Sequence, residues 1–429
     1  MVVAHDIVNF SPQKDLNWLF FDLNSYFASV EQQDRPELRH KPIVVVPSDT
    51  DSTCAIAASY EAKAYGIKTG TKIYEAKKMC PDLICVLARH DIYVDYHHRI
   101  FDEVARHIPI TKVCSIDEAA CRLMDNERDL ERAVEIAKQI KQGLKENIGA
   151  YIKCSIGLAP NAFLAKVATD MQKPDGLVIL KADVYHHKLF TLKLRDLCGI
   201  GSNIERRLNG AGITTIEQFW NTPSKHIRKI WGGVGGETFW YKLHGYEIPD
   251  KATQKSVVGH SRVLDPVFRD SDKALPMALQ LTTKACTRLR RSALYAGKFS
   301  LSVRTTSGGA WACDTSFPAT QDNFIVTKAL HDMWAQMQVE TRKHPLKKIS
   351  VSLYDFYKPE EMTLDLFDVV DRDLKVSKQT SQLSEAMDVL NKKFGGNTVN
   401  LGMCPKTSSG YVGTKIAFTR VPKKEEFME

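Results

Sequence analysis

The sequence predicts a multidomain α+β protein, and three observations support this class. At 429 residues the chain is too long for a single hydrophobic core, so we expect three or four domains. Apolar strand-like runs alternate with helical patterns up to about residue 180, and a Gly-punctuated helical stretch follows from 190 to 250. After a linker at 250–256, residues 257–353 show the pattern β-α-β-β-α-β.

The first expected strand is the apolar run Trp18–Phe21, which ends at Asp22. Asn24 or Ser25 can cap the helix that follows. Further expected elements are strands at 41–46, 83–88 and 151–158, helices at 91–107 and 127–146, and a helix within 160–176 that stops at Pro-Asp-Gly. The segment 112–123 has the length of two short strands that meet near Asp117 and Glu118.

Asp117 and Glu118 stand side by side in an apolar run, SIDEAACRL. Within a strand, neighbouring side chains point to opposite faces, so one acid would face the core, where an unpaired carboxylate is costly. At a hairpin tip both acids can project the same way, towards a divalent metal that Asp22 also reaches. A surface turn with two solvated acids is the alternative, and this pair alone leaves both open.

The helical stretch from 190 to 250 contains Gly199-Ile200-Gly201, which we expect to join two short helices as in a helix-hairpin-helix. Such a turn exposes backbone N–H groups to a phosphate and does not recognise bases. An ordinary Gly-capped helix pair is the alternative. The neighbouring Arg206 and Arg207 favour DNA binding.

The segment KFSLSVRT predicts a strand with two different faces. Its core face carries Phe299, Leu301 and Val303, and its other face carries Lys298, Ser300, Ser302 and Arg304. A small, polar and basic face can lie against a phosphate backbone, and a plain solvated sheet face explains the pattern equally well.

Composition limits the class of partner and the compartment. Lys plus Arg number 59 and Asp plus Glu 51, and the excess of +8 suits an acidic partner such as nucleic acid, although solubility alone explains it too. The ten cysteines are scattered without a CxxC pair, which disfavours zinc and is typical of reduced thiols. The N-terminus has no signal pattern and no apolar run approaches a membrane span, so we expect a cytoplasmic protein without a membrane partner.

Four motifs together resemble those of the Y-family DNA polymerases. They are FFDLNSYFASVEQ (20–32), ASYEAKAYGIKTG (58–70), SIDEAACRL (115–123) and GLAPNAFLAKVATDMQKPDGL (157–177), and they occur in the order and spacing of that family. The resemblance covers roughly residues 17 to 355. It implies a right-hand polymerase that copies damaged templates with low fidelity in DNA repair and the SOS response to damage.

The resemblance also implies a domain arrangement. It places the palm at 1–25 and 89–175, the fingers at 26–88, the thumb with its helix-hairpin-helix at 176–250, and the little finger at 256–356. Residues 361–429 then form a C-terminal tail. Primer-template DNA and deoxynucleoside triphosphates are the implied partners, and accessory repair proteins are further candidates.

By the match, Asp22, the Leu23 carbonyl, Asp117 and Glu118 hold two Mg²⁺ ions. Such ions suit oxygen ligands and the charge of phosphoryl transfer. The implied nucleotide-binding residues are Tyr26, Phe27, Tyr60, Lys63 and Lys166, and the implied DNA contacts are Gly199, Gly201 and the polar face of 298–304. Phe27 stands where the family places an aromatic steric gate against a 2′-hydroxyl; a buried helix aromatic is the alternative.

Three positions depart from the pattern of many members. Lys63 stands where many members have Arg. A guanidinium group that can bind a phosphate through two N–H groups is thus replaced by an ammonium group with a single compact charge. Ala57 replaces a Thr, and Ser25 replaces an aromatic residue. These changes put substrate affinity in doubt and leave the metal site untouched. The tripeptide EAK at 61–63 and the long C-terminal tail resemble polymerase V catalytic subunits more closely than polymerase IV.

The tail contains TLDLF (363–367), which resembles the peptide by which bacterial polymerases dock on the sliding clamp. Leu364, Leu366 and Phe367 would fill an apolar pocket, while Thr363 replaces the usual Gln. Two other functions compete with a polymerase: a catalytically weak accessory protein that bridges DNA, clamp and other polymerases, and a nucleotide cyclase on a related palm. The presence of all three acids argues against the first, and the DNA-binding segments argue against the second.

Overall fold

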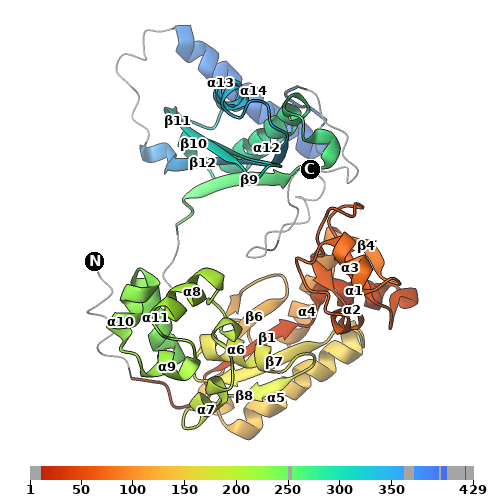
Figure 1. Ribbon diagram of the computed structural model, residues 1–429, viewed down its shortest axis with the longest axis vertical. Coiled ribbons are helices and arrows are strands. Elements are labelled where there is room, and N and C mark those ends of the chain that lie inside the picture. Colours follow the sequence, from red (N-terminus) through yellow and green to blue (C-terminus); the bar gives the residue numbers. More distant parts are fainter. Residues whose placement is uncertain (1–10, 250–253, 362–371, 396–397, 403–420, 422–429) are drawn as a thin grey trace. The chain divides into compact units, whose positions relative to one another are not determined.

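The computed structural model describes residues 11–249, 254–361, 372–395, 398–402 and 421. The chain divides into two compact units, and the boundary between Lys251 and Ala252 falls within the expected linker at 250–256 (Figure 1). Each unit has its own sheets and helices, so the multidomain α+β class is confirmed. No helix in the described ranges combines the length and the apolar composition needed to cross a bilayer.

The first unit is built on a five-stranded sheet of order β5-β6-β1-β7-β8. Its strands are β1 (Trp18–Leu23), β5 (Lys112–Val113), β6 (Glu118–Arg122), β7 (Cys154–Ala159) and β8 (Leu177–Ile179). Its helices are α1 (Tyr26–Asp34), α4 (His90–Ala105), α5 (Leu130–Gly143) and α6 (Ala162–Met171). Strand β1 lies between β6 and β7 and pairs antiparallel with both.

Every residue of β1 is buried, because helices cover both faces of this central strand. Trp18 and Phe20 pack into the core that includes α6, and Phe21, on the opposite face, meets Phe101 of α4 at 5.2 Å between ring centroids. Asp22 shares the face of Trp18 and Phe20, since strand side chains alternate. The end of β1 therefore delivers its acid towards α6.

A second, three-stranded sheet of order β3-β2-β4 follows α1 in the chain. It consists of β2 (Ile43–Val46), β3 (Ala57–Ala58) and β4 (Ile84–Leu87), with helices α2 (Tyr60–Ala64) and α3 (Ile73–Met79) beside it. Val44, Ala62 and Ile73 share a separate core of small and β-branched side chains. This sheet places α2 close to the start of α1.

The segment after β8 is helical as expected, with one correction. It contains α7 (Tyr185–Phe190), α8 (Ser202–Gly210), α9 (Ile216–Asn221), α10 (Ser224–Trp231) and α11 (Val234–Leu243). Ahead of Gly199 there is only a 3₁₀ turn, Leu194–Asp196, so the turn at 199–201 does not join two α-helices. Leu194, Leu197 and Ile200 are buried three residues apart, which suits the 3₁₀ period of three.

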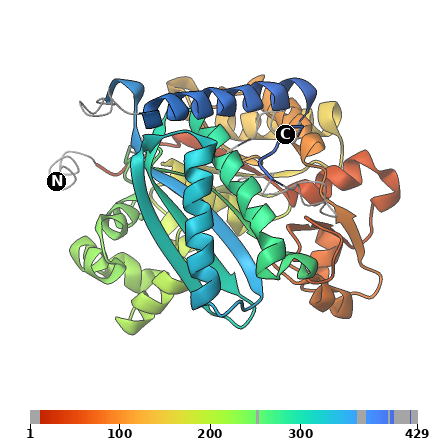
Figure 2. The ribbon, with the colours of Figure 1, turned by 90° about the horizontal axis from the view of Figure 1, so that it is seen from above.

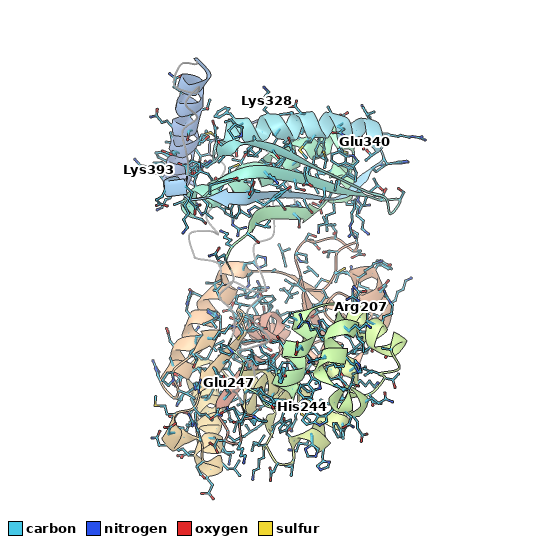
Figure 3. All side chains as sticks on the ribbon, turned by 90° about the vertical axis from the view of Figure 1, so that its left-hand side faces the viewer. Arg207, His244, Glu247, Lys328, Glu340 and Lys393 are labelled. Atoms are coloured by element: carbon cyan, nitrogen blue, oxygen red, sulfur yellow. The ribbon has the colours of Figure 1, made fainter. Side chains whose placement is uncertain are left out.

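The second unit is a four-stranded antiparallel sheet of order β11-β10-β12-β9. Its elements are β9 (Val257–Val263), α12 (Ser271–Arg291), β10 (Tyr295–Thr305), β11 (Ala310–Thr320), α13 (Asn323–Glu340) and β12 (Leu346–Tyr357). The order β-α-β-β-α-β is the expected one, and Figure 2 shows α12 and α13 side by side on one face of the sheet. Lys328 and Glu340 mark the exposed side of α13 in Figure 3.

A further helix, α14 (Arg372–Phe394), packs against α13 and extends the helical patch expected at 384–394. Asp388 of α14 accepts hydrogen bonds from Arg290 Nε at 2.6 Å and Thr287 Oγ1 at 2.8 Å on α12. Ser384 and Thr380 donate to Asp322, the N-cap residue of α13. Polar contacts with two helices therefore fix α14 to the second unit.

We predict that Asp388→Ala releases α14, because it leaves the Arg290 guanidinium, whose side chain is 6 % exposed, without its anion. Breaking such a pair costs about 3 kcal/mol. Hydrogen–deuterium exchange should show faster exchange over 379–394 and urea unfolding a lower midpoint. Glu385→Ala, on an exposed position of α14, serves as the control. Wild-type exchange in Asp388→Ala would contradict the docking described.

Candidate active site

Three acidic side chains gather where β1 and β6 meet. Asp22 of β1 and Glu118 of β6 are direct cross-strand partners, so their side chains share one face of the sheet. Asp117 lies at the tip of the β5–β6 hairpin, and its carbonyl accepts a hydrogen bond from Leu23 N at 2.9 Å. The hairpin expected at 112–123 is thus present, and it brings the acid pair to the end of β1.

Two lysines neutralise these acids. Lys166 of α6 donates to Asp22 and to Glu118, while Lys173, in the loop after α6, donates to Asp22 Oδ1 at 2.8 Å. Asp170 contacts both ammonium groups, at 3.6 Å from Lys166 Nζ and 2.8 Å from Lys173 Nζ. Helix α6 and its C-terminal loop thus hold two cations against the carboxylates.

The pKa shifts reflect this crowding of charge. Burial alone would raise the pKa of Asp22, but the charges of Lys166 and Lys173 outweigh it and hold that pKa below its ordinary value. Burial, followed by the neighbouring Asp22 carboxylate, raises the pKa of Glu118 to about 7. Burial and the Asp22 charge also raise the pKa of Asp117, against the effect of its hydrogen bond from Ser115. A nearby positive charge would therefore favour the ionised form of both acids of the hairpin.

The three carboxylates suit a hard divalent cation, which prefers oxygen ligands. In the described part of the chain, no three His, Cys, Asp or Glu side chains converge into a ready-made metal site. The ammonium group of Lys166 contacts two of these acids, Asp22 and Glu118. The donor set fits a metal ion that would take over part of the charge that Lys166 now supplies.

A second cluster of polar groups lies at the start of α1 and α2. Lys63 Nζ donates to Ser25 Oγ at 2.6 Å and lies 4.4 Å from the centre of the Tyr60 ring. The buried Tyr60 Oη has no hydrogen-bond partner within the described structure. Burial, and then the charge of Lys173, lower the pKa of Lys63. Two cations and an unused hydroxyl close together form a cradle for an anion.

Ser25 occupies the N-cap position of α1 and no side chain caps the helix, so the expected cap by Asn24 or Ser25 is absent. Its φ of 50° lies in the left-handed region, which is uncommon for a serine. Strain of this kind collects at functional sites. Here it leaves the Ser25 hydroxyl free to meet Lys63. Asn24 instead accepts from Asp175 N at 2.7 Å and donates to Ser155 Oγ at 3.1 Å.

The two aromatic residues that open α1 differ in their surroundings. Tyr26 is 3 % exposed and its hydroxyl donates to the Tyr93 carbonyl at 2.6 Å, so the structure uses it for packing, and its expected nucleotide contact finds no support. Phe27 stacks on the ring of Tyr93, with centroids 4.6 Å apart. The Tyr93 hydroxyl in turn donates to Glu31 at 2.7 Å, and Arg89 pairs with Glu31 at 2.7 Å. A buried ion-pair network therefore fixes the ring behind Phe27.

The expected DNA contacts lie in both units. Gly199 has a φ of 104°, and Gly201, Ser202 and Asn203, at the start of the nine-residue helix α8, are exposed. Of the two nearby arginines, Arg206 is exposed and Arg207 donates to the Trp231 carbonyl at 2.7 Å (Figure 3). The guanidinium group of Arg206 is therefore more available to a phosphate than that of Arg207.

Strand β10 has the two faces that its sequence predicts. Phe299, Leu301 and Val303 are buried in the core under α12 and α13. The partly or fully exposed side chains on the other face are Lys298, Ser300, Ser302 and Arg304. In register beside them, β12 adds Lys348, Ser350, Ser352 and Tyr354. The clamp-like peptide, with Leu364, Leu366 and Phe367, lies outside the described residues.

Lys173 and Asp170 belong to this site, and the sequence reasoning gave neither a role. Lys173 is 151 positions from Asp22 in the chain, and the Pro-Asp-Gly that follows it predicts only a helix stop. The spacing of Lys166 and Asp170 places these two residues on one side of α6, whereas Lys173 lies in the loop beyond the helix, where no sequence period marks it.

Comparisons with known proteins agree with this geometry. Residues 21–170 match the model of the impB/mucB/samB family, and residues 255–366 match the model of its C-terminal domain. DNA polymerase IV of Pelotomaculum thermopropionicum is 31% identical over 397 residues, which is 89% of this chain and 93% of the relative. DNA polymerase IV 1 of Bacillus subtilis is 28% identical over 91% of this chain and 94% of its own length. These relatives lend no support to a closer likeness to polymerase V.

Solved structures are similar as well. A Y-family DNA polymerase chimera, Dbh-Dpo4(243-245)-Dbh, matches with a TM-score of 0.68 and 26% identity, covering 80% of this chain and 99% of the chimera. The insertion ternary complex of Dbh DNA polymerase matches over the same shares with a TM-score of 0.51 and 26% identity. Both likenesses span the two units described above.

Proposed function

The chain belongs to the Y family of DNA polymerases and is a DNA-directed DNA polymerase of the translesion type, and we propose that Asp22, Asp117 and Glu118 form its metal centre. Enzymes of this family depend on metal ions. The observation that carries the proposal is that Asp22 and Glu118 are cross-strand partners at the ends of two paired strands, with Asp117 directly before Glu118 in the hairpin turn. We assign two Mg²⁺ ions to them, with the Leu23 carbonyl as a further ligand. Bound there, the ions would activate the primer hydroxyl and neutralise charge on the departing pyrophosphate.

The triphosphate of the incoming deoxynucleotide would lie on the anion cradle. Lys63 and the Tyr60 hydroxyl, both on α2, and Lys173, in the loop after α6, supply two cations and one hydrogen-bond donor. Lys166 would add positive charge from the side of the acids. Phosphoryl transfer requires positioning and charge neutralisation above all, and this cluster provides both.

Phe27 would exclude ribonucleotides. Its ring is held from behind by Tyr93, which Glu31 and the α4 backbone fix in place, so it cannot easily move away from a 2′-hydroxyl. The small residues of 54–59 would leave the new base pair loosely held, which fits low fidelity and tolerance of damaged templates.

Primer-template DNA would contact the N-terminus of α8 after Gly199 and Gly201, and the polar face of β10 at Lys298, Ser300, Ser302 and Arg304. We further propose the sliding clamp, through Leu364, Leu366 and Phe367, and accessory repair proteins as partners. A cytoplasmic location suits the free cysteines of the described ranges, which would stay reduced there.

We expect Asp117→Ala to abolish primer extension, since it removes one carboxylate of the metal centre while the folded units keep their DNA contacts. Primer extension with Mg²⁺ and deoxynucleotides measures the activity, and a gel-shift assay measures DNA binding. Asp82→Ala, an exposed acid of the same type, should extend like the wild type. Extension by Asp117→Ala at the wild-type rate would refute the metal assignment.

Replacing Phe27 by Ala should admit ribonucleotides, because it removes the ring that meets the 2′-hydroxyl. The ratio of kcat/KM for deoxy- over ribonucleotides should fall by at least about tenfold, or roughly 1.4 kcal/mol of discrimination. Phe27→Tyr keeps the ring and should keep the ratio. If Phe27→Ala discriminates as the wild type does, Phe27 is only a core aromatic.

Clamp docking predicts that changing Leu366 and Phe367 to Ala together abolishes stimulation by a purified sliding clamp but spares basal extension. The exposed pair Glu360 and Glu361, changed to Ala, provides the control. Equal stimulation of all three proteins would exclude this peptide as the docking site.

A further inference from the structure

A buried histidine supports the acid hairpin from the side opposite the lysines. His97 of α4 is 5 % exposed, and its Nδ1 lies 2.7 Å from the carbonyl oxygen of Ile116. Ile116 is itself buried and directly precedes Asp117. A carbonyl oxygen only accepts, so Nδ1 must carry the proton and donate it.

The turn between β5 and β6 depends on this hydrogen bond. Its other backbone hydrogen bonds run from Cys114 N and Ser115 N to the Glu118 carbonyl, and from Leu23 N to the Asp117 carbonyl. The Ile116 carbonyl receives its donor from the imidazole of another element. A buried carbonyl must be hydrogen-bonded, so this contact fixes the peptide plane that joins Ile116 to Asp117.

The same ring also reaches the strand that carries the other acid. The His97 ring packs on Phe101 with centroids 3.9 Å apart, and Phe101 meets Phe21 at 5.2 Å. Phe21 directly precedes Asp22 in β1. One side chain on α4 therefore supports the backbone immediately before Asp117 and, through one intervening ring, the backbone immediately before Asp22.

The protonation state suits this role. Burial lowers the pKa of His97 to about 4, against the effect of the Ile116 carbonyl, so the ring is neutral and keeps Nδ1–H over the working range of an ordinary enzyme. The adjacent His98 is exposed and has no comparable hydrogen bond to the hairpin within the described structure. The two neighbouring histidines thus have different surroundings.

We propose that His97 is a positioning residue of the metal centre: its hydrogen bond to the Ile116 carbonyl sets the orientation of Asp117 towards a divalent cation. The proposal rests on the function proposed above. It assigns His97 no contact with metal or nucleotide, and it predicts that metal affinity depends on a donor at the position of Nδ1. Groups that hydrogen-bond metal ligands directly commonly change metal affinity or activity 10- to 100-fold, and His97 acts on the peptide group next to a ligand.

The test compares two substitutions of nearly the same shape. His97→Asn can place an amide N–H near the position of Nδ1, whereas His97→Leu fills similar space without a donor. His98→Leu is the control for the substitution itself. Mn²⁺ binding is measured by electron paramagnetic resonance on each full-length protein with a dideoxy-terminated primer-template and the matching deoxynucleotide, so that no reaction occurs. Single-nucleotide insertion kinetics and thermal unfolding are measured in parallel.

We expect His97→Leu to weaken Mn²⁺ binding by about tenfold or more and to lower kcat by 10- to 100-fold, with the KM for the deoxynucleotide within about twofold. His97→Asn should stay within about threefold of wild type, and His98→Leu should match it. Wild-type Mn²⁺ binding by His97→Leu would overturn the proposal, as would equal losses in the Asn and Leu variants.

A folding defect is separated from a positioning defect by a second pair. If His97→Leu does not fold, His97→Gln, whose amide lies one carbon farther out, takes its place beside His97→Asn. Metal binding should then be weakened in the Gln variant alone, and equal binding in both would overturn the proposal. If the wild-type complex itself binds no Mn²⁺ and extends no primer, the proposed metal centre fails, which is a different outcome.

Discussion

Crowding of negative charge at the end of β1 is the constraint on which the rest of the first unit depends. Asp22 and Glu118 are direct cross-strand partners, and like charges in that position destabilise a sheet. A strand buried along its whole length can end in such a pair only if cations stand beside it. Helix α6 and the loop after it supply them as Lys166 and Lys173. The fold thus brings together carboxylates that need positive charge, which is the electrostatic condition for a metal site.

The lysines beside the acids carry positive charge that is not fully balanced, and this points to the triphosphate of the incoming nucleotide. Burial and Lys173 lower the pKa of Lys63, so two ammonium groups lie close enough to repel each other. Asp170 offsets part of that charge at Lys173, and Lys63 rests on the Tyr60 ring and the Ser25 hydroxyl. An incoming triphosphate would supply the missing negative charge on this side, as metal ions would supply the positive charge on the other. A complex of the protein with DNA, nucleotide and metal ions would therefore supply the missing negative charge at the lysines and the missing positive charge at the acids.

Much of this site follows from sequence, and the exceptions have physical reasons. An apolar run that ends in an acid, and two acids at the centre of a short hairpin, predict the meeting of Asp22, Asp117 and Glu118, because strand pairing is regular. Lys173 escapes such reasoning, since a loop places it and no periodicity marks loops. The first half of α14 escapes it too: Thr380 has a modest helix propensity, and its hydroxyl bonds to Asp322 across a tertiary contact. The turn before Gly199 looks like a helix in sequence but follows a three-residue period.

The two faces of the central sheet contact the acids in different ways, and this difference gives the reason for the positioning role proposed for His97. On the α6 face, lysines contact the carboxylates and would have to adjust when metal and nucleotide bind. On the α4 face, the His97 ring lies tilted against Phe101 and the Phe101 ring meets Phe21 edge to face, and closely packed cores of this kind deform little. An ion with near-ideal octahedral geometry tolerates small errors in ligand position poorly. The rigid face must therefore set the backbone positions of Asp117 and Asp22, because the adaptable face cannot.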